Sequence, residues 1–143
     1  MSDGAVPPRF LAAVPAMPVS DMDRATAFYT GALGMTVAHR EARFAILTRD
    51  RVELHLWGAT DGDWRGRPGF HAQPVETGAE TFIAGTASCR IAVEGLDALH
   101  DACADAGVIH PNGPLAEKPW GTREFATLDP DGNLVTLYER LAR

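Results

Sequence analysis

Apolar and polar positions along the chain predict two similar halves, each made of strands and one helix. The first half is predicted to contain strands at residues 10–19, 35–40, 43–48 and 52–57 and a helix at residues 22–33. Pro15 and Pro18 remove backbone donors from the first strand, so we expect that strand at a sheet edge or only partly paired. Ser20 or Asp21 can cap the helix, and Gly34 can end it.

The second half repeats this order after a long stretch without periodicity. Its predicted elements are strands at residues 87–93, 123–128 and 134–140, a helix at residues 96–106 and at most a short strand within residues 108–115. The stretch 58–86 that joins the halves is rich in glycine, and a loop of this length is usually functional or disordered. The sequence therefore predicts two modules, at about residues 10–57 and 87–140.

Both modules read as strand, helix and three strands, and short segments of the two halves are similar. Aligning the halves pairs Phe44 with Phe125, His55 with Thr136 and Trp57 with Tyr138. Two sheets with one helix each leave one face of each sheet for a ligand or a partner. We therefore expect an α+β fold, in which two tandem βαβββ modules form a single domain.

The composition is that of a soluble globular protein, and it narrows the classes of partner. The chain has 143 residues and a formal net charge of −6, which argues against binding to nucleic acid. We find no apolar run long enough to cross a membrane and no signal peptide, so we expect a cytoplasmic protein. Cys89 and Cys103 lack metal-site spacing, and we expect two thiols rather than a disulfide.

Polar and aromatic residues alternate with apolar ones on several predicted strands, which places them on the uncovered sheet faces. His55 shares a face with Glu53 and Trp57, where it is either a structural histidine with one hydrogen bond or part of a ligand groove. Arg90 and Tyr138 lie on the same kind of face in the second module. Arg90 is expected to pair with a carboxylate such as Glu53 or Glu139, or to contact a ligand.

Trp120 lies between Pro119 and Gly121, before a strand and the turn Asp129-Pro130-Asp131-Gly132. A planar aromatic ring in this position can stack on a flat ligand, and it can also pack on a partner subunit. Trp64, in the long loop, can cover a ligand or simply anchor that loop. No catalytic triad, phosphate-binding loop or dinucleotide-binding motif is evident in the chain.

Several motifs resemble the vicinal-oxygen-chelate superfamily, and in particular its bleomycin-resistance branch. The similar segments are Ala13-Val14-Pro15, Ala27-Phe28-Tyr29, Leu33-Gly34, Gly95-Leu96-Asp97, Pro119-Trp120-Gly121, Arg123-Glu124-Phe125-Ala126 and Asp129-Pro130-Asp131-Gly132-Asn133. The resemblance implies non-covalent sequestration of a cationic, planar, bleomycin-type glycopeptide by a binding protein rather than an enzyme. It also implies a homodimer that exchanges its first strand, with Trp120 stacking on the drug.

Enzymes of this superfamily commonly bind a divalent metal ion at four positions, and aligning the repeat assigns these positions to Val14, His55, Ser88 and Thr136. Only His55 is a competent ligand, and a stable site needs at least three, so we expect neither metal nor cofactor. The alternative is a superfamily enzyme of the lyase, isomerase or dioxygenase type that acts on a small substrate through His55 and Glu53, with or without a metal ion. A third possibility is a binding module for another small aromatic metabolite.

The ligand-binding residues expected from the faces and the resemblance are Trp120, Trp57, His55, Phe44, Arg90, Tyr138 and Trp64. The chain departs from related bleomycin binders at Ala38 and His39, where those proteins carry an acidic and an aromatic residue.

Overall fold

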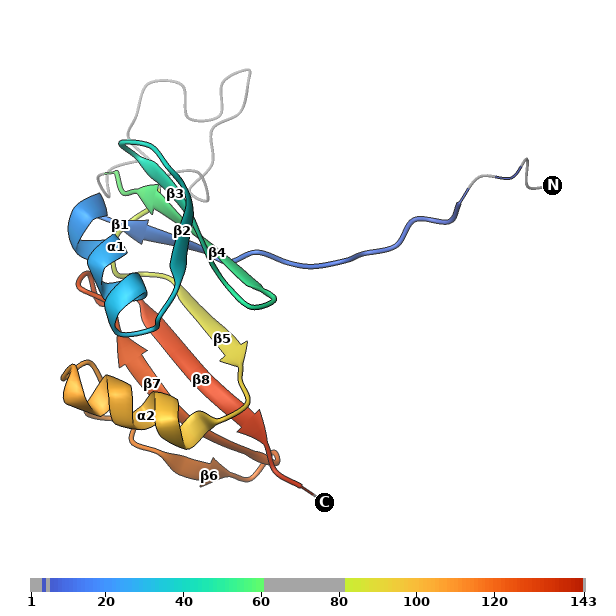
Figure 1. Ribbon diagram of the computed structural model, residues 1–143, viewed down its shortest axis with the longest axis vertical. Helices are drawn as coiled ribbons and strands as arrows, with labels where there is room; N and C mark the ends of the chain where they lie inside the picture. The colour runs from blue at the N-terminus through green and yellow to red at the C-terminus, as the bar shows by residue number, and fades with distance from the viewer. Residues whose placement is uncertain (1–3, 5, 61–81, 143) are drawn as a thin grey trace.

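The computed structural model describes residues 4, 6–60 and 82–142, and it contains the two predicted modules (Figure 1). In chain order the elements are β1 (Ala16–Val19), α1 (Met22–Gly31), β2 (Thr36–Arg40), β3 (Phe44–Arg49), β4 (Val52–Gly58), β5 (Ser88–Ala92), α2 (Leu96–Asp105), β6 (Ala116–Lys118), β7 (Thr122–Leu128) and β8 (Leu134–Arg140). This order confirms the α+β class and the repeat of strand, helix and three strands.

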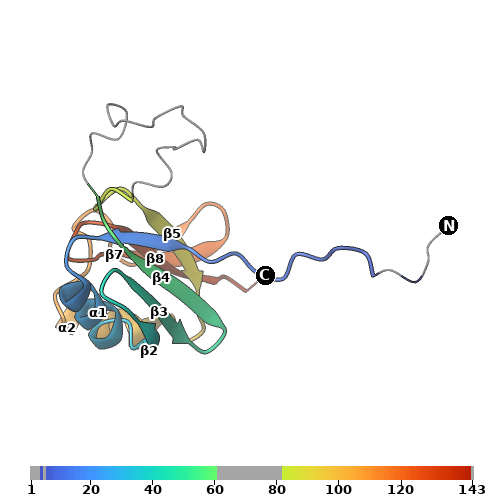
Figure 2. The ribbon, with the colours of Figure 1, turned by 90° about the horizontal axis from the view of Figure 1, so that it is seen from above.

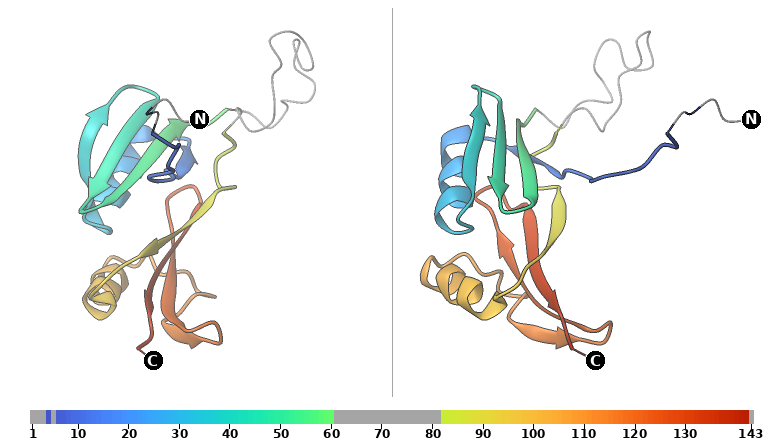
Figure 3. Two further views of the ribbon diagram at one scale, coloured as in Figure 1. Left: turned by 90° about the vertical axis from the view of Figure 1, so that its right-hand side faces the viewer. Right: turned by 45° about the vertical axis from the view of Figure 1, so that its right-hand side comes forward.

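The strands form two four-stranded sheets, with the orders β1-β4-β3-β2 and β5-β8-β7-β6. The strand that precedes each helix pairs in parallel with the last strand of its module, and the other pairs are antiparallel. α1 packs on β2, β3 and β4, and α2 packs on β7 and β8. The two helices lie on the same side of the molecule (Figures 1 and 3), so each sheet has a helix-free face. Among the described residues, no helix combines the length and apolarity of a membrane span.

α1 begins and ends with the signals that the sequence contains. The Asp21 carboxylate accepts a hydrogen bond of 3.0 Å from the backbone N–H of Arg24, as an N-cap does. Gly34 has a φ of +64°, and the N–H of Met35 donates to the carbonyl of Tyr29 at 3.0 Å. This hydrogen-bond pattern closes the helix. Glycine suits position 34 because it has no side chain and adopts the left-handed backbone without steric cost.

A buried hydrogen-bond network, called the junction network below, joins the two modules. The side chain of Asn133 has no solvent exposure, and its Nδ2 donates to the Pro18 carbonyl at 2.7 Å and to Asp129 Oδ2 at 2.8 Å. Its Oδ1 accepts from the backbone N–H of Ala87 at 3.2 Å, and the Tyr29 hydroxyl donates to Asp129 Oδ2 at 2.9 Å. The turn between β7 and β8 is thereby fixed to β1, α1 and the approach to β5.

The first predicted strand is only partly formed, and it lies at a sheet edge as the prolines predict. The prediction of a strand over residues 10–15 is wrong. The carbonyl of Pro15 still accepts from the N–H of His55 at 3.0 Å, but the preceding chain leaves the body of the molecule (Figures 1 and 2). Pro15 removes a donor that the ladder needs at the point where pairing with β4 begins.

Two further details differ from the sequence prediction. The short strand lies at Ala116–Lys118 instead of within residues 108–115, where only an isolated bridge from Ile109 to Thr127 forms. Pro111, Gly113 and Pro114 interrupt that segment. Cys89 and Cys103 are free thiols, as predicted, and burial raises the pKa of Cys89 to about 11.

The alignment of the two halves is displaced by one residue on one strand. Phe44 lies opposite Trp57, whereas the residue opposite Tyr138 is Glu124. The structural counterpart of Phe44 is therefore Glu124, and the predicted pairing of Phe44 with Phe125 is wrong. The turn between β7 and β8 is longer than the turn between β3 and β4, so constant spacing cannot align both strands of the hairpin.

Candidate functional site

Three strands of the second sheet bring a charged and aromatic group together on its helix-free face. Glu124 on β7 lies directly opposite Tyr138 on β8, and Arg90 on β5 lies next to the same part of β8. Thr122 precedes Glu124 by two residues, so its side chain lies on the same face. Trp120 stands in the turn between β6 and β7. We call these five residues the indole–carboxylate cluster.

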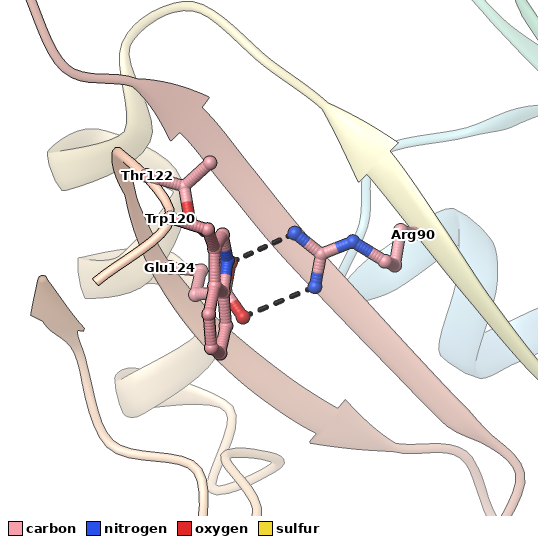
Figure 4. Close-up of polar contacts among 4 residues, drawn as sticks. All are labelled: Arg90, Trp120, Thr122 and Glu124. Atoms are coloured by element: carbon pink, nitrogen blue, oxygen red, sulfur yellow. Dashed lines mark hydrogen bonds and ion pairs between the residues drawn. The ribbon is translucent and has the colours of Figure 1, made fainter. Parts of the chain in front are cut away.

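The Glu124 carboxylate is the acceptor at the centre of this cluster (Figure 4). Arg90 donates from Nη1 to Oε1 at 3.1 Å and from Nη2 to Oε2 at 2.8 Å, which is the strong bidentate geometry. Oε2 also accepts from Thr122 Oγ1 at 2.7 Å and from Trp120 Nε1 at 3.4 Å. The Arg90 guanidinium carbon lies 4.6 Å from the centre of the Tyr138 ring, a cation–π distance.

The charge of Arg90 is neutralised inside the cluster. The Glu124 side chain is only 8% exposed, and the hydrogen bonds from Arg90 lower its pKa to about 2. The hydrogen bond to Glu124 likewise raises the pKa of Arg90. The predicted pairing of Arg90 with Glu53 or Glu139 is wrong, because the strand register places Glu124 within reach instead. A cationic ligand on this face therefore meets an ion pair rather than a free arginine.

Trp120 is held at the surface and does not serve as a core anchor within the chain. The residue is 61% exposed. Its turn is closed by a hydrogen bond of 3.0 Å from the Gly121 N–H to the Lys118 carbonyl, and the Leu141 N–H donates to the Gly121 carbonyl at 2.9 Å. Gly121 has a φ of +87°, which favours glycine. A fixed turn thus presents a large planar ring to solvent.

Aromatic rings line the helix-free face of the first sheet. Phe44 on β3 packs against His55 and Trp57 on β4, with ring centres 5.1 and 4.5 Å apart. Trp57, 36% exposed, stacks on Phe82 with ring centres 5.2 Å apart. His55 Nε2 lies 2.6 Å from Glu53 Oε2, which gives the histidine its hydrogen-bond partner. We call the four rings of Phe44, His55, Trp57 and Phe82 the aromatic strip.

Ala38 and His39 lie at an irregularity of β2. The register of β2 against β3 shifts between Val37 and His39, as in a β-bulge. The His39 ring centre is 6.1 Å from that of Phe44, and His39 Nε2 lies 3.3 Å from a Glu41 carboxylate oxygen. An imidazole paired with a carboxylate therefore borders the aromatic strip.

The predicted ligand residues fall into two groups on two sheets. Phe44, His55 and Trp57 meet in the aromatic strip, and Arg90, Trp120 and Tyr138 meet in the indole–carboxylate cluster. Trp64 lies outside the described residues. The sequence prediction omitted Glu124, Thr122 and Phe82. Alternation along a strand does not carry through the turn between β7 and β8, so the sequence held no signal that would place Glu124 beside Tyr138. Phe82 has no periodic signal because it follows the long loop.

The residues at the superfamily's metal positions do not fit a metal ion. His55 is the one strong donor among the four, since the others are valine, serine and threonine. Val14 also lies on the segment that leaves the body, where it is 41% exposed. Among residues 4, 6–60 and 82–142, no three His, Cys, Asp or Glu side chains are grouped so that they could hold a metal ion.

Comparison with known proteins agrees with this fold. The bleomycin resistance proteins of Geobacillus stearothermophilus and Staphylococcus aureus are each 46% identical over 131 residues, which is 92% of this chain and 98% of theirs. The crystal structure of the bleomycin-binding protein from Streptomyces verticillus, complexed with copper(II)-bleomycin, is 27% identical with a TM-score of 0.65, covering 94% of this chain and 98% of that one. A lactoylglutathione lyase from Agrobacterium tumefaciens, 17% identical over 93% of this chain and 96% of that one, shares the fold with a TM-score of 0.69. Residues 12–137 match the model of the Glyoxalase/Bleomycin resistance protein/Dioxygenase superfamily, and the chain belongs to this superfamily.

Proposed function

We propose that this protein confers resistance to a bleomycin-type glycopeptide by binding it without making or breaking a bond. The observation that carries the proposal is the exposed indole of Trp120, which donates to the same Glu124 carboxylate that neutralises Arg90. A flat heteroaromatic group can stack on such a ring, and the ion pair beside it does not repel a cation. The names of the relatives at 46% identity support the same function.

The charge of the whole chain favours the capture of a cationic drug. A net charge of −6 produces a negative potential that raises the encounter rate with cations, and this effect weakens with added salt. Stacking and apolar contact then supply the binding energy close to the surface. Stoichiometric binding lowers the free concentration of the drug, which is enough to protect its target.

We propose that residues 6–14, called the N-terminal arm below, bind a second copy of this chain. The arm carries four large exposed apolar side chains, which are Val6, Phe10, Leu11 and Val14, with exposures of 83%, 102%, 84% and 41%. Exposed apolar groups in a row favour burial against another surface. In a homodimer that exchanges the arms, the aromatic strip and the indole–carboxylate cluster could face each other across the subunit interface.

Sedimentation or light scattering of the full-length protein tests this assembly. The double variant Phe10→Asp/Leu11→Asp is expected to sediment as a monomer because the charges oppose burial of the arm. Val37→Asp alters an apolar side chain outside the arm that is 38% exposed, and it should leave the dimer intact. A wild-type protein that is monomeric at micromolar concentration contradicts the homodimer.

Calorimetric titration with metal-free and with copper-loaded bleomycin tests the function itself. We expect saturation at one drug per subunit, with quenched tryptophan fluorescence. Trp120→Ala should weaken binding by about 30-fold, as loss of a central aromatic contact does, while Trp120→Phe retains a stacking surface. The absence of heat at high micromolar drug would refute sequestration. Unchanged affinity of Trp120→Ala would refute only the site.

A second candidate function follows from the pair of Glu53 and His55. A carboxylate 2.6 Å from an imidazole can orient that ring and support it as a general base. An enzyme of the lyase or isomerase type would use this pair on a small substrate bound against the aromatic strip. His55→Gln should abolish turnover in that case, and turnover that survives the substitution would refute this candidate. The cytoplasmic location stays a prediction, which cell fractionation can check.

A further inference from the structure

We propose that Glu124 is a positioning residue that fixes the orientation of the Trp120 ring in the free protein. The proposal rests on the proposed function, because orientation of this ring matters only if the ring contacts the ligand. Glu124 is the acceptor of the one hydrogen bond that the indole makes within the described residues, at 3.4 Å. The turn holds the backbone of Trp120, but the bonds of that turn leave both side-chain torsions free.

The carboxylate can position the ring because it is itself held from two other directions. Arg90 fixes both oxygens from β5, and Thr122 donates to Oε2 at 2.7 Å from β7, the strand that carries Glu124. Figure 4 shows the Trp120 indole lying against the Glu124 carboxylate, while Arg90 approaches that carboxylate from β5. Side chains that are locked by their own partners hold a contact residue more precisely than a mobile acceptor would.

A Trp120 ring that is already fixed raises the affinity for the ligand because less side-chain conformational entropy is lost on binding. Immobilising a mobile side chain at an interface weakens binding by an amount that corresponds to about 2- to 12-fold in Kd. The ion pair with Arg90 has a second consequence, since it leaves the carboxylate unable to attract a cation strongly. Glu124 thus acts on the ligand through Trp120 rather than by direct charge.

The double variant Arg90→Met/Glu124→Met tests the role without leaving a buried charge unpaired. Replacing both members of an ion pair by apolar side chains of similar shape is often neutral for folding. In ¹H–¹⁵N spectra of the free protein, the indole N–H signal of Trp120, assigned by its loss in Trp120→Phe, should exchange faster with solvent in the double variant. Its heteronuclear NOE should fall as well. An indole signal that keeps its wild-type exchange and NOE overturns the proposal.

Four further variants separate positioning from charge. Arg90→Met keeps the Glu124 acceptor and its hydrogen bond from Thr122, so the indole signal should keep more order than in the double variant. Glu124→Gln retains an oxygen acceptor and should restore part of the order that Glu124→Met loses. Glu139→Gln, which removes a carboxylate that contacts Arg123 on the same sheet, is the matched control and should change nothing at Trp120.

Titration of the same variants with metal-free bleomycin connects order to affinity. The double variant should bind about 2- to 12-fold more weakly than the wild type. Recovery of wild-type affinity in the double variant, together with weak binding by Glu124→Met alone, would show that an exposed Arg90 charge was responsible and would overturn the positioning role. If the wild type fails to bind the drug, the proposed function fails, whereas the spectra of the free protein still decide what Glu124 does.

Discussion

Asn133→Ala removes the centre of the junction network, and its cost can be worked out from the contacts. The Asn133 side chain is fully buried and forms two neutral hydrogen bonds, with the Pro18 carbonyl and the Ala87 N–H. Each is worth about 1 kcal/mol, and the bond to the Asp129 carboxylate is worth about 2 kcal/mol. We therefore expect the free energy of unfolding to fall by about 4 kcal/mol, a large part of the stability of a domain of this size.

Urea unfolding followed by far-UV circular dichroism measures this loss. With a slope of about 1.5 kcal/mol per molar urea, the midpoint should fall by roughly 2 to 3 M while the slope stays constant. Asn112→Ala is the matched control, since Asn112 is exposed, and it should change the free energy by less than about 0.5 kcal/mol. A loss below about 1 kcal/mol for Asn133→Ala would refute the reasoning, because water or a shifted backbone would then have replaced the buried bonds.

Tyr29→Phe provides a milder test if Asn133→Ala does not fold. The Tyr29 hydroxyl is a buried donor to Asp129, and burial raises its pKa well above the ordinary value, so it stays protonated at all ordinary pH values. The variant keeps the ring and loses one bond to a carboxylate. We expect a loss of about 1.5 to 3 kcal/mol in the same urea assay.

Two more predictions concern pH and helix capping. The pKa of Glu124 is about 2 in the folded protein against an ordinary 4.5, so its stabilisation is complete above about pH 5 and is lost as the pH falls toward 2. This difference in pKa corresponds to about 3 kcal/mol of folding free energy. Solvent screening of the half-exposed Arg90 reduces the contribution to about 2 kcal/mol. Unfolding of Glu124→Gln between pH 5 and 2 should therefore show a shallower loss than the wild type, and parallel curves would contradict the linkage. Asp21→Ala should cost about 1 kcal/mol through loss of the N-cap. Asp23→Ala breaks a surface ion pair and should cost less than about 0.5 kcal/mol, so equal losses in the two variants would contradict the capping role.

The sequence by itself determined both helices, most of the strands and the direction of alternate side chains along them. Alternation placed His55 and Trp57 together on the uncovered face, and the structure confirms this because the intervening Leu54 and Leu56 are fully buried. The capping and stop signals gave the limits of α1 to within two residues, and the prolines identified β1 as an edge strand. These features are short-range, because side-chain direction and backbone preference depend on neighbours along the chain.

Only the tertiary structure decided which residues from distant segments meet. Glu124 and Arg90 are 34 positions apart, and their pairing depends on the register of β5, β8 and β7. The hairpin of β7 and β8 is one residue longer than that of β3 and β4. This difference brings Glu124 rather than Phe125 opposite Tyr138, and a shift of one residue turns every side chain of a strand to the other face of the sheet. The carboxylate that holds Trp120 was for this reason hidden in the sequence, although the tryptophan itself was conspicuous.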